Sequence, residues 1–325
     1  MAQAFDRYDQ DLEHRLGSEV LNMGIAVKLA YDARDIVGES IIWAEAEKAV
    51  YWVDIVGQRI QRFEPERGLY QFWETPELVT SIGLARGGKF IVGLRSRVCL
   101  WSPGSQFETL AVPEPDRPEN RLNEGVVAPD GSFWVGTMLD NIGPAGEPVE
   151  ITKNTGALYR IAPDGGVTQL TENTFGITNT MIWPDESTFI TADTLVNTLF
   201  TYHYNSKAHK LSGRQEIAAG IDRGLPDGSC MIAGGGKFLN CRTAGGKSVI
   251  EISADGCSVR CFDLPCQSPT SCTFGGENYS TLFVTSARFG TDKTYLTDHP
   301  EEGGLFAVTM GTVGKPGNVF DNSRA

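Results

Sequence analysis

Residues 39–54 read ESIIWAEAEKAVYWVD, and this stretch contains the pattern that decides the fold. The polar residue Glu39 precedes a short apolar run, Ile41–Trp43. A polar turn follows, and then a second run, Val50–Asp54, which contains two aromatic residues. Short runs of β-branched and aromatic residues between polar turns are typical of antiparallel strands. The stretch therefore predicts two neighbouring strands of one sheet.

The same order recurs five more times along the chain. Each unit begins with a polar residue just before its first strand: Glu39, Thr80, Glu124, Asn179, Asp227 and Thr270. These residues are 41, 44, 55, 48 and 43 positions apart, and a four-stranded propeller blade takes about 40–50 residues. The longest step contains residues 140–154, whose glycine and proline content predicts a loop. We therefore expect an all-β chain folded as a six-bladed β-propeller, in which the starts of the innermost strands converge on one mouth of the channel.

The first 26 residues do not follow this pattern. Phe5, Tyr8, Leu12 and Leu16 have helical spacing, so residues 1–26 are predicted to form an N-terminal arm or helix. Residues 27–325 are predicted to form the propeller domain.

Composition and charge exclude several classes of function. The formal net charge of -13 is unfavourable for binding nucleic acid. No apolar run is long enough to span a membrane, and the charged N-terminus does not resemble a secretory signal. The odd number of cysteines, seven, favours free thiols in a reducing compartment, so a cytoplasmic location is expected. The cysteines between Cys257 and Cys272 lack a CxxC pair and are expected to be small buried residues rather than zinc ligands.

Polar residues in four of the repeats have the chemistry of a metal site. They are Glu39, Asn123, Asn179 and Asp227, each at or next to the start of a predicted innermost strand. Asn and Asp are also common in turns, but Glu is a poor turn former. Two carboxylates and two amides brought together at the channel would give an all-oxygen donor set that suits a hard divalent cation. None of the four histidines lies at a blade start, and no Gly-x-Ser-x-Gly motif indicates a serine hydrolase.

Several motifs, in this order and at these spacings, resemble those of the gluconolactonase/regucalcin (senescence marker protein) family. The motifs are Gly38–Trp43, Tyr51–Asp54, Arg121–Gly125, Pro129–Met138, Gly156–Arg160, Pro226–Gly228 and Ser268–Gly276. The resemblance covers about residues 27–313. It implies a six-bladed propeller that holds one divalent metal (calcium favoured, with zinc, magnesium, manganese or iron as alternatives).

The resemblance also implies roles for individual residues. The metal ligands of the family correspond to Glu39, Asn179 and Asp227, and its substrate-binding residues to Arg121 and Asn123. A further substrate contact corresponds to either Asp140 or Asn141. Members usually carry Asn-Gly where this chain has Asn179-Thr180, so the backbone is expected to differ there.

The expected activity is hydrolysis of a sugar lactone to the aldonic acid. The metal would polarise the carbonyl and activate water, with Asp227 as general base. The expected partner is the small-molecule lactone, and the sequence does not specify an oligomeric state. Two alternatives stay open: a propeller hydrolase that acts on phosphotriesters or aryl esters, and a non-enzymatic cation-binding propeller.

Overall fold

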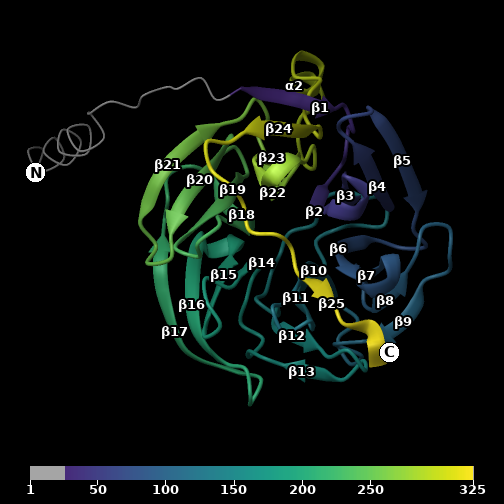
Figure 1. Cartoon of the computed structure of the whole chain (residues 1–325), viewed down its shortest axis with the longest axis vertical. Coiled ribbons are helices and arrows are strands. Elements are labelled where there is room, and N and C mark those ends of the chain that lie inside the picture. The colour runs from purple at the N-terminus through teal and green to yellow at the C-terminus, as the bar shows by residue number, and fades with distance from the viewer. Residues whose placement is uncertain (1–25, 325) are drawn as a thin grey trace, which may run out of the picture.

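The computed structural model describes residues 26–324. Six sheets, antiparallel except for the pairing of β25 with β6, are arranged in a ring around a central channel (Figure 1). The predicted six-bladed β-propeller is confirmed. The predicted N-terminal arm lies outside the described residues, and the first described strand, β1, begins at Val27.

The blades follow one another along the chain, and each begins with its innermost strand. Blade 1 comprises β2 (Gly38–Ala44), β3 (Ala49–Asp54), β4 (Arg59–Glu64) and β5 (Leu69–Glu74). Blade 2 comprises β6 (Val79–Ala85), β7 (Lys89–Leu94), β8 (Val98–Trp101), β9 (Glu108–Ala111) and, from the C-terminal segment, β25 (Val319–Phe320). Blade 3 comprises β10 (Asn120–Val127), β11 (Phe133–Leu139), β12 (Leu158–Ile161) and β13 (Val167–Gln169).

The second half of the ring repeats this arrangement. Blade 4 comprises β14 (Thr178–Ile182), β15 (Thr188–Asp193), β16 (Thr198–Asn205) and β17 (Lys210–Ala219). Blade 5 comprises β18 (Leu225–Met231), β19 (Lys237–Thr243), β20 (Ser248–Ser253) and β21 (Ser258–Asp263). Blade 6 comprises β22 (Pro269–Gly275), β23 (Thr281–Ser286), β24 (Leu305–Thr309) and β1 (Val27–Tyr31). Within residues 26–324 the helices are one short α-helix, α2 (Lys293–Asp298), and five 3-10 turns: η1 (Glu45–Glu47), η2 (Arg86–Gly88), η3 (Thr194–Val196), η4 (Glu277–Tyr279) and η5 (Asn322–Arg324).

The hydrophobic core is divided among the six interfaces between neighbouring blades. Each interface has its own cluster of buried side chains: one joins blades 1 and 2 around Tyr51 and Phe90, for example, and another joins blades 3 and 4 around Trp134 and Phe189. A single four-stranded sheet has two apolar faces, and packing in a ring buries both against neighbours. The inner strands are therefore buried at nearly every position, as β3 and β14 show, whereas the outer strand β5 has no fully buried residue.

Pairing of the first strand with the last blade closes the ring. Strand β1 lies antiparallel to β24 at the outer edge of blade 6, with Val27 opposite Val308. Blade 6 therefore combines the first described strand with three strands from residues 269–309, and β1 and β24 lie side by side in Figure 1.

Every innermost strand has an irregular register close to its start. The shifts in pairing with the second strand lie between Glu39 and Ile42 in β2, Leu122 and Gly125 in β10, and Pro226 and Ser229 in β18. The same irregularity occurs in β6, β14 and β22. A β-bulge redirects the side chains next to it. The bulges lie at the polar residues that begin the six repeats of the sequence, so they affect the direction of these side chains.

The C-terminal segment crosses the opposite mouth of the channel. In Figure 1 it runs across the ring and ends as β25 beside the innermost strand β6. On the way, the backbone N–H of Lys315 donates to the Met231 carbonyl oxygen at 3.0 Å, and Asn318 Nδ2 donates to the Val127 carbonyl oxygen at 2.9 Å. Residues 315–318 line one side of a cavity of about 130 Å³ inside the channel. We call residues 311–320 the C-terminal strap.

The helices of residues 26–324 are all too short or too polar to cross a membrane.

Candidate functional site

Four side chains predicted from the sequence meet at the mouth where the innermost strands begin. Asn123 Nδ2 donates to Asn179 Oδ1 at 3.2 Å, and the carboxyl groups of Glu39 and Asp227 interact with each other. Asn179 Nδ2 donates to Thr194 Oγ1 at 2.8 Å, and this hydroxyl donates to the Pro226 carbonyl oxygen at 2.7 Å, next to Asp227. The structure therefore brings blades 1, 3, 4 and 5 together at one point through their bulged strand starts.

A third acidic residue, Glu124, belongs to the same group. It is buried, its charge acts on Asp227, and the charge of Glu39 acts on it. Glu124 was predicted only as a blade-start residue and not as part of the site; side chains of consecutive strand residues normally point to opposite faces. The bulge between Leu122 and Gly125 breaks this alternation. We call Glu39, Asn123, Glu124, Asn179 and Asp227 the axial cluster.

Burial controls the protonation of the acidic members of the axial cluster. It raises the pKa of Asp227, and the charges of Glu39 and Glu124 raise it further. Burial also raises the pKa of Glu39, although a hydrogen bond from the backbone N–H of Ser40 and the interaction with Asp227 oppose this rise. The pKa of Glu124 is raised by burial and then by Glu39. Neighbouring carboxyl groups in such surroundings favour a bound proton or a bound cation.

The donor atoms of the axial cluster fit a hard divalent cation. Asp227 Oδ1 is buried and has no hydrogen-bond donor among the described residues. Asn179 uses its amide nitrogen on Thr194, so its oxygen is the atom that remains beside Asn123. Carboxylate and amide oxygens are the ligands that calcium and magnesium prefer. Within residues 26–324, no three His, Cys, Asp or Glu side chains are grouped for a metal, so a ligand set here requires the Asn179 oxygen.

Arg121 lies beside the axial cluster and is held in a fixed orientation. Its Nη1 donates to Asn123 Oδ1 and to the Leu122 carbonyl oxygen, both at 2.8 Å. Its Nη2 and Nε donate to Asn141 Oδ1 at 2.8 and 3.3 Å. Burial lowers the pKa of Arg121 to about 10, while Asp140 and Glu39 oppose this effect. The guanidinium group therefore stays charged at neutral pH.

The two residues between which the sequence could not choose have different contacts. Asn141 accepts both hydrogen bonds from Arg121 described above. The nearest approach of Asp140 to Arg121 is 3.7 Å, and its other carboxylate oxygen lies 2.5 Å from Arg95. Both residues therefore surround the Arg121 side chain, and Asn141 makes the tighter contact.

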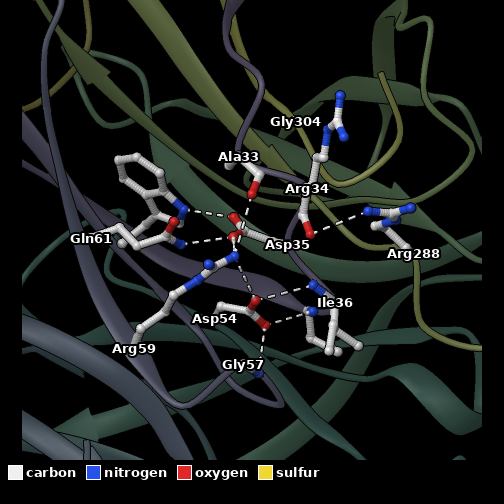
Figure 2. Close-up of polar contacts among 12 residues, drawn as sticks. Ala33, Arg34, Asp35, Ile36, Asp54, Gly57, Arg59, Gln61, Arg288 and Gly304 are labelled. Carbon is white, nitrogen blue, oxygen red and sulfur yellow. Dashed lines mark hydrogen bonds and ion pairs between the residues drawn. The ribbon is translucent and has the colours of Figure 1, made fainter. Parts of the chain in front are cut away.

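A buried ionic network holds the segment that carries Glu39 (Figure 2). The Asp54 carboxylate accepts from the backbone N–H groups of Ile36 and Val37 at 3.1 and 3.0 Å. Arg59 Nη2 bridges Asp54 and Asp35 at 3.2 and 3.1 Å. Because Val37 is two residues before Glu39, these bonds fix the backbone that leads into β2 and determine where the Glu39 carboxylate lies.

The same arrangement supports Asn179, and a related one supports Asp227. The Asp193 carboxylate accepts from the backbone N–H groups of Gly176 and Ile177 at 2.9 and 3.1 Å. In blade 5 the charge is reversed, since Arg242 donates to the carbonyl oxygens of Arg223 and Gly224 at 3.0 and 2.7 Å. A charged side chain at the end of the second strand therefore positions the start of the first strand in each of these blades.

Two loops border this mouth. Ile142, in the predicted loop after β11, packs into the cluster that joins blades 1 and 2. A Cβ at Gly290 would lie 3.7 Å from Pro148 of that loop, so the loop that contains α2 meets it. Blade 3 thus extends a loop across the mouth, and the two loops limit the size of any ligand that reaches the axial cluster.

Blades 2 and 6 and the histidines of the described residues add no side chain to the axial cluster. Thr270 Oγ1, at the start of blade 6, donates to the Gly38 carbonyl oxygen at 2.5 Å, and Thr80 of blade 2 donates to the Gly93 carbonyl oxygen at 3.3 Å. The histidines of residues 26–324 lie away from the axial cluster, on β16, in the turn after it, and at the C-terminal end of α2.

The family model and a curated relative point to the same family. Residues 37–288 match the family described as SMP-30/Gluconolactonase/LRE-like region. Regucalcin of Gallus gallus is 31% identical over 289 residues, which cover 87% of this chain and 94% of that protein.

Solved structures share the fold. A calcium-binding protein, regucalcin, from Agrobacterium tumefaciens superposes with a TM-score of 0.82 at 24% identity and covers 91% of this chain and 97% of its own. A gluconolactonase from Xanthomonas campestris superposes with a TM-score of 0.72 at 20% identity, covering 88% and 90%. At these identities the two structures establish the six-bladed architecture alone.

Proposed function

The chain belongs to the SMP-30/gluconolactonase/LRE-like family, as its motifs predicted, and from this premise we propose that it hydrolyses a sugar lactone to the aldonic acid with one divalent cation. One observation carries the proposal. Four blades each bring an oxygen-bearing side chain to the same mouth of the channel, beside a buried arginine whose partners hold it in place.

Glu39, Asn179 and Asp227 are the proposed ligands of the cation. Calcium is favoured, since a protein of the same fold is described as calcium-binding and since all three donors are oxygen atoms. When bound, a divalent cation polarises a carbonyl oxygen and lowers the pKa of water.

Asp227 is the proposed general base. Its Oδ1 is buried and has no donor among residues 26–324, so this atom is available to accept the proton of an attacking water. Burial and the neighbouring acids raise the pKa of this carboxyl group. A base with a raised pKa accepts a proton more strongly at neutral pH than an ordinary aspartate does.

Arg121 is the proposed anchor for the substrate. A guanidinium group has five N–H donors, and four hydrogen bonds to Leu122, Asn123 and Asn141 leave one N–H of Nη2 available. That donor can bind a sugar hydroxyl or the developing oxyanion, for which a charged donor is the stronger partner. Asn123 donates both of its amide N–H groups, to the Thr178 carbonyl oxygen and to Asn179 Oδ1. Its proposed contribution is to fix the positions of the Arg121 and Asn179 side chains relative to each other.

The decisive experiment removes the metal with a chelator and restores Ca²⁺, Zn²⁺, Mn²⁺, Mg²⁺ and Fe²⁺ one at a time. Acid release from glucono-, galactono-, xylono- and arabinono-lactone is followed at constant pH, with the spontaneous rate subtracted. We expect no activity without metal and recovery with one or more cations. Hydrolysis of a phosphotriester or aryl ester but of no lactone would overturn the proposal, and so would metal binding without turnover of any substrate.

The Asp227→Asn substitution tests the general base. Asparagine keeps an oxygen for the cation but cannot take a proton, and positioned bases contribute about 10²–10⁴-fold to rate. We therefore expect kcat at saturating metal to fall by about that factor. Asp222→Asn, the same change at an exposed position of the preceding loop, is the matched control and should leave kcat unchanged. Full activity of Asp227→Asn with the metal bound would disprove the assignment.

A further inference from the structure

Three thiols lie together between blades 5 and 6, and two of them, Cys230 and Cys272, line the channel cavity. Cys230 of β18 and Cys272 of β22 are in sulfur–sulfur contact at 3.5 Å, and the Cys241 thiol hydrogen-bonds to Cys272. All three were expected to be ordinary free thiols, and the cysteines of residues 257–272 were expected to be buried. That expectation is wrong for Cys257 and Cys261, which are exposed, and correct for Cys272.

The backbone brings the first two thiols together. A Cβ added at Gly228 would lie 2.7 Å from Ser271 Oγ and 2.9 Å from Ser271 Cα, so β18 and β22 approach each other closely at this level. Cys230 and Cys272 both line the channel cavity of about 130 Å³, and Cys230 is partly exposed. A molecule little larger than water can therefore reach this pair.

We propose that Cys230 and Cys272 are a site of reversible disulfide formation by a hydroperoxide, and that the bond weakens the axial cluster. The sulfur atoms have to approach by about 1.5 Å to reach the length of about 2 Å of a disulfide. No other described residue lies between them, since they are already in contact.

Cys272 is the better nucleophile of the pair. Hydrogen bonds from the thiols of Cys230 and Cys241 lower the pKa of Cys272, whereas burial raises the pKa of each of those two partners. The Cys272 thiolate attacks one peroxide oxygen, the O–O bond breaks, and hydroxide (or alkoxide) leaves with the electron pair to give a sulfenic acid. The Cys230 sulfur then attacks the sulfenic sulfur, and its proton leaves with the displaced hydroxide as water. Two thiols are oxidised and one peroxide is reduced.

The pair is connected to the axial cluster through both strands. Cys230 lies three residues after Asp227 on β18. On β22, Thr270 lies two residues before Cys272, and its hydroxyl is bonded to the Gly38 carbonyl oxygen, next to Glu39. Drawing β18 and β22 together therefore displaces the backbone next to two proposed ligands. This second part of the proposal rests on the function proposed above, whereas bond formation does not.

The test uses full-length protein, hydrogen peroxide and peptide mass analysis after alkylation of the remaining thiols. Trypsin places Cys230 on the fragment Gly224–Lys237 and Cys272 on Cys261–Arg288, while Cys241 lies on a third fragment. We expect these two fragments to be linked after oxidation and separated by dithiothreitol. The link should be absent from Cys230→Ser and Cys272→Ser, and retained in Cys261→Ser, which changes an exposed thiol on the same fragment.

The same samples are titrated with Ca²⁺ and assayed on lactones before and after oxidation. We expect the rate to fall by up to about 10²-fold, because a misplacement of about 1 Å at a reacting centre can have an effect of this size. Calcium affinity should fall as well, and both should recover with dithiothreitol. Bond formation is overturned if Cys230 and Cys272 still alkylate when Cys257 and Cys261 are oxidised, or if Cys230 links to Cys241 instead. A complete link with unchanged calcium affinity would overturn the connection to the axial cluster, even if the chain opened no lactone.

Discussion

Ser40 and Thr180, which follow two of the proposed ligands directly, have left-handed backbone conformations with φ of 50° and 53°. Such angles are unusual for residues other than glycine and are outliers for β-branched ones. The backbone difference expected at Asn179-Thr180 stays a prediction, but Thr180 itself is β-branched and strained in this conformation. Its hydroxyl donates to the Asp227 carbonyl oxygen at 2.5 Å and accepts from Asn240 Nδ2 at 3.2 Å. These bonds oppose the strain and tie blade 4 to blade 5.

Replacing Thr180 with valine should therefore reduce both stability and metal affinity. Valine keeps the β-branch and its strain but leaves the buried partners of the hydroxyl unsatisfied, a loss of about 1–3 kcal/mol. Thr180→Ser keeps the hydroxyl and is the matched control, with little change expected. Urea unfolding and calorimetric titration with Ca²⁺ measure the two effects. Equal losses in the two variants would show that the hydroxyl is unimportant.

Asp35 gives the fold a dependence on pH that is separate from the metal site. Burial, and then repulsion from Asp54, raise the pKa of Asp35 to about 7, against hydrogen bonds from Trp52 and Gln61 and the charge of Arg59. In the unfolded chain an aspartate has a pKa of about 3.9. The folded state therefore binds this proton more tightly, and the stability gained from it is lost as the pH rises from about 4 through about 7.

Unfolding by urea at pH 5, 6, 7 and 8 tests this dependence. The free energy of unfolding of the wild type should decrease more steeply over this range than that of Asp35→Asn, which does not titrate. Asp32→Asn, at an exposed neighbouring position, controls for the substitution itself. Parallel curves for wild type and Asp35→Asn would contradict the raised pKa.

Within the blades, the charged residue at the end of the second strand determines where the first strand begins. The Asp193 carboxylate accepts hydrogen bonds from the backbone N–H groups of Gly176 and Ile177. In Asp193→Asn the side-chain amide would place an N–H donor against one of these two donors. We expect a loss of about 1–3 kcal/mol in stability and weaker binding of Ca²⁺, because Asn179 follows this backbone. Glu216→Gln on the outermost strand of the same blade removes a charge at an exposed position and should change neither quantity. An unaltered calcium affinity in Asp193→Asn would separate this residue from the site.

The sequence predicted the strands well and the site in part, for physical reasons that differ. The repeated pattern of apolar residues predicted the six innermost strands. Glu39, Asn123, Asn179 and Asp227 were predicted to lie together because each stands at or next to the start of such a strand. Glu124 was missed because a bulge, which has no signature in a single sequence, cancels the alternation of side chains. Thr194 was missed because its contact with Asn179 depends on the 3-10 turn after β15. The C-terminal strap was missed because Lys315–Asn318 reads as a loop, and its bonds connect it to residues far away in the sequence.

Phe320 is the large buried side chain of the strap. Phe320 is fully buried in the cluster that joins blades 2 and 3, whereas its neighbour Val319 is 45% exposed. Phe320→Ala should lower the free energy of unfolding by about 3–5 kcal/mol, as is usual for a buried phenylalanine. Val319→Ala should change it by less than about 0.5 kcal/mol. Urea unfolding compares the two, and similar midpoints would mean that the strap does not contribute to stability.

The pairing of β1 with β24 has a consequence for synthesis of the protein in the cell. Strand β1 is translated first among the blades, but its partner β24 follows only after five blades and two strands of the sixth. Until then the blades of the nascent polypeptide form an incomplete ring. The blade at each end of this ring has an uncovered apolar face, and β1 has not yet paired with β24. Such long-range pairing is slow to form and prone to aggregation. Any fragment that stops before Leu305 should therefore remain dependent on chaperones.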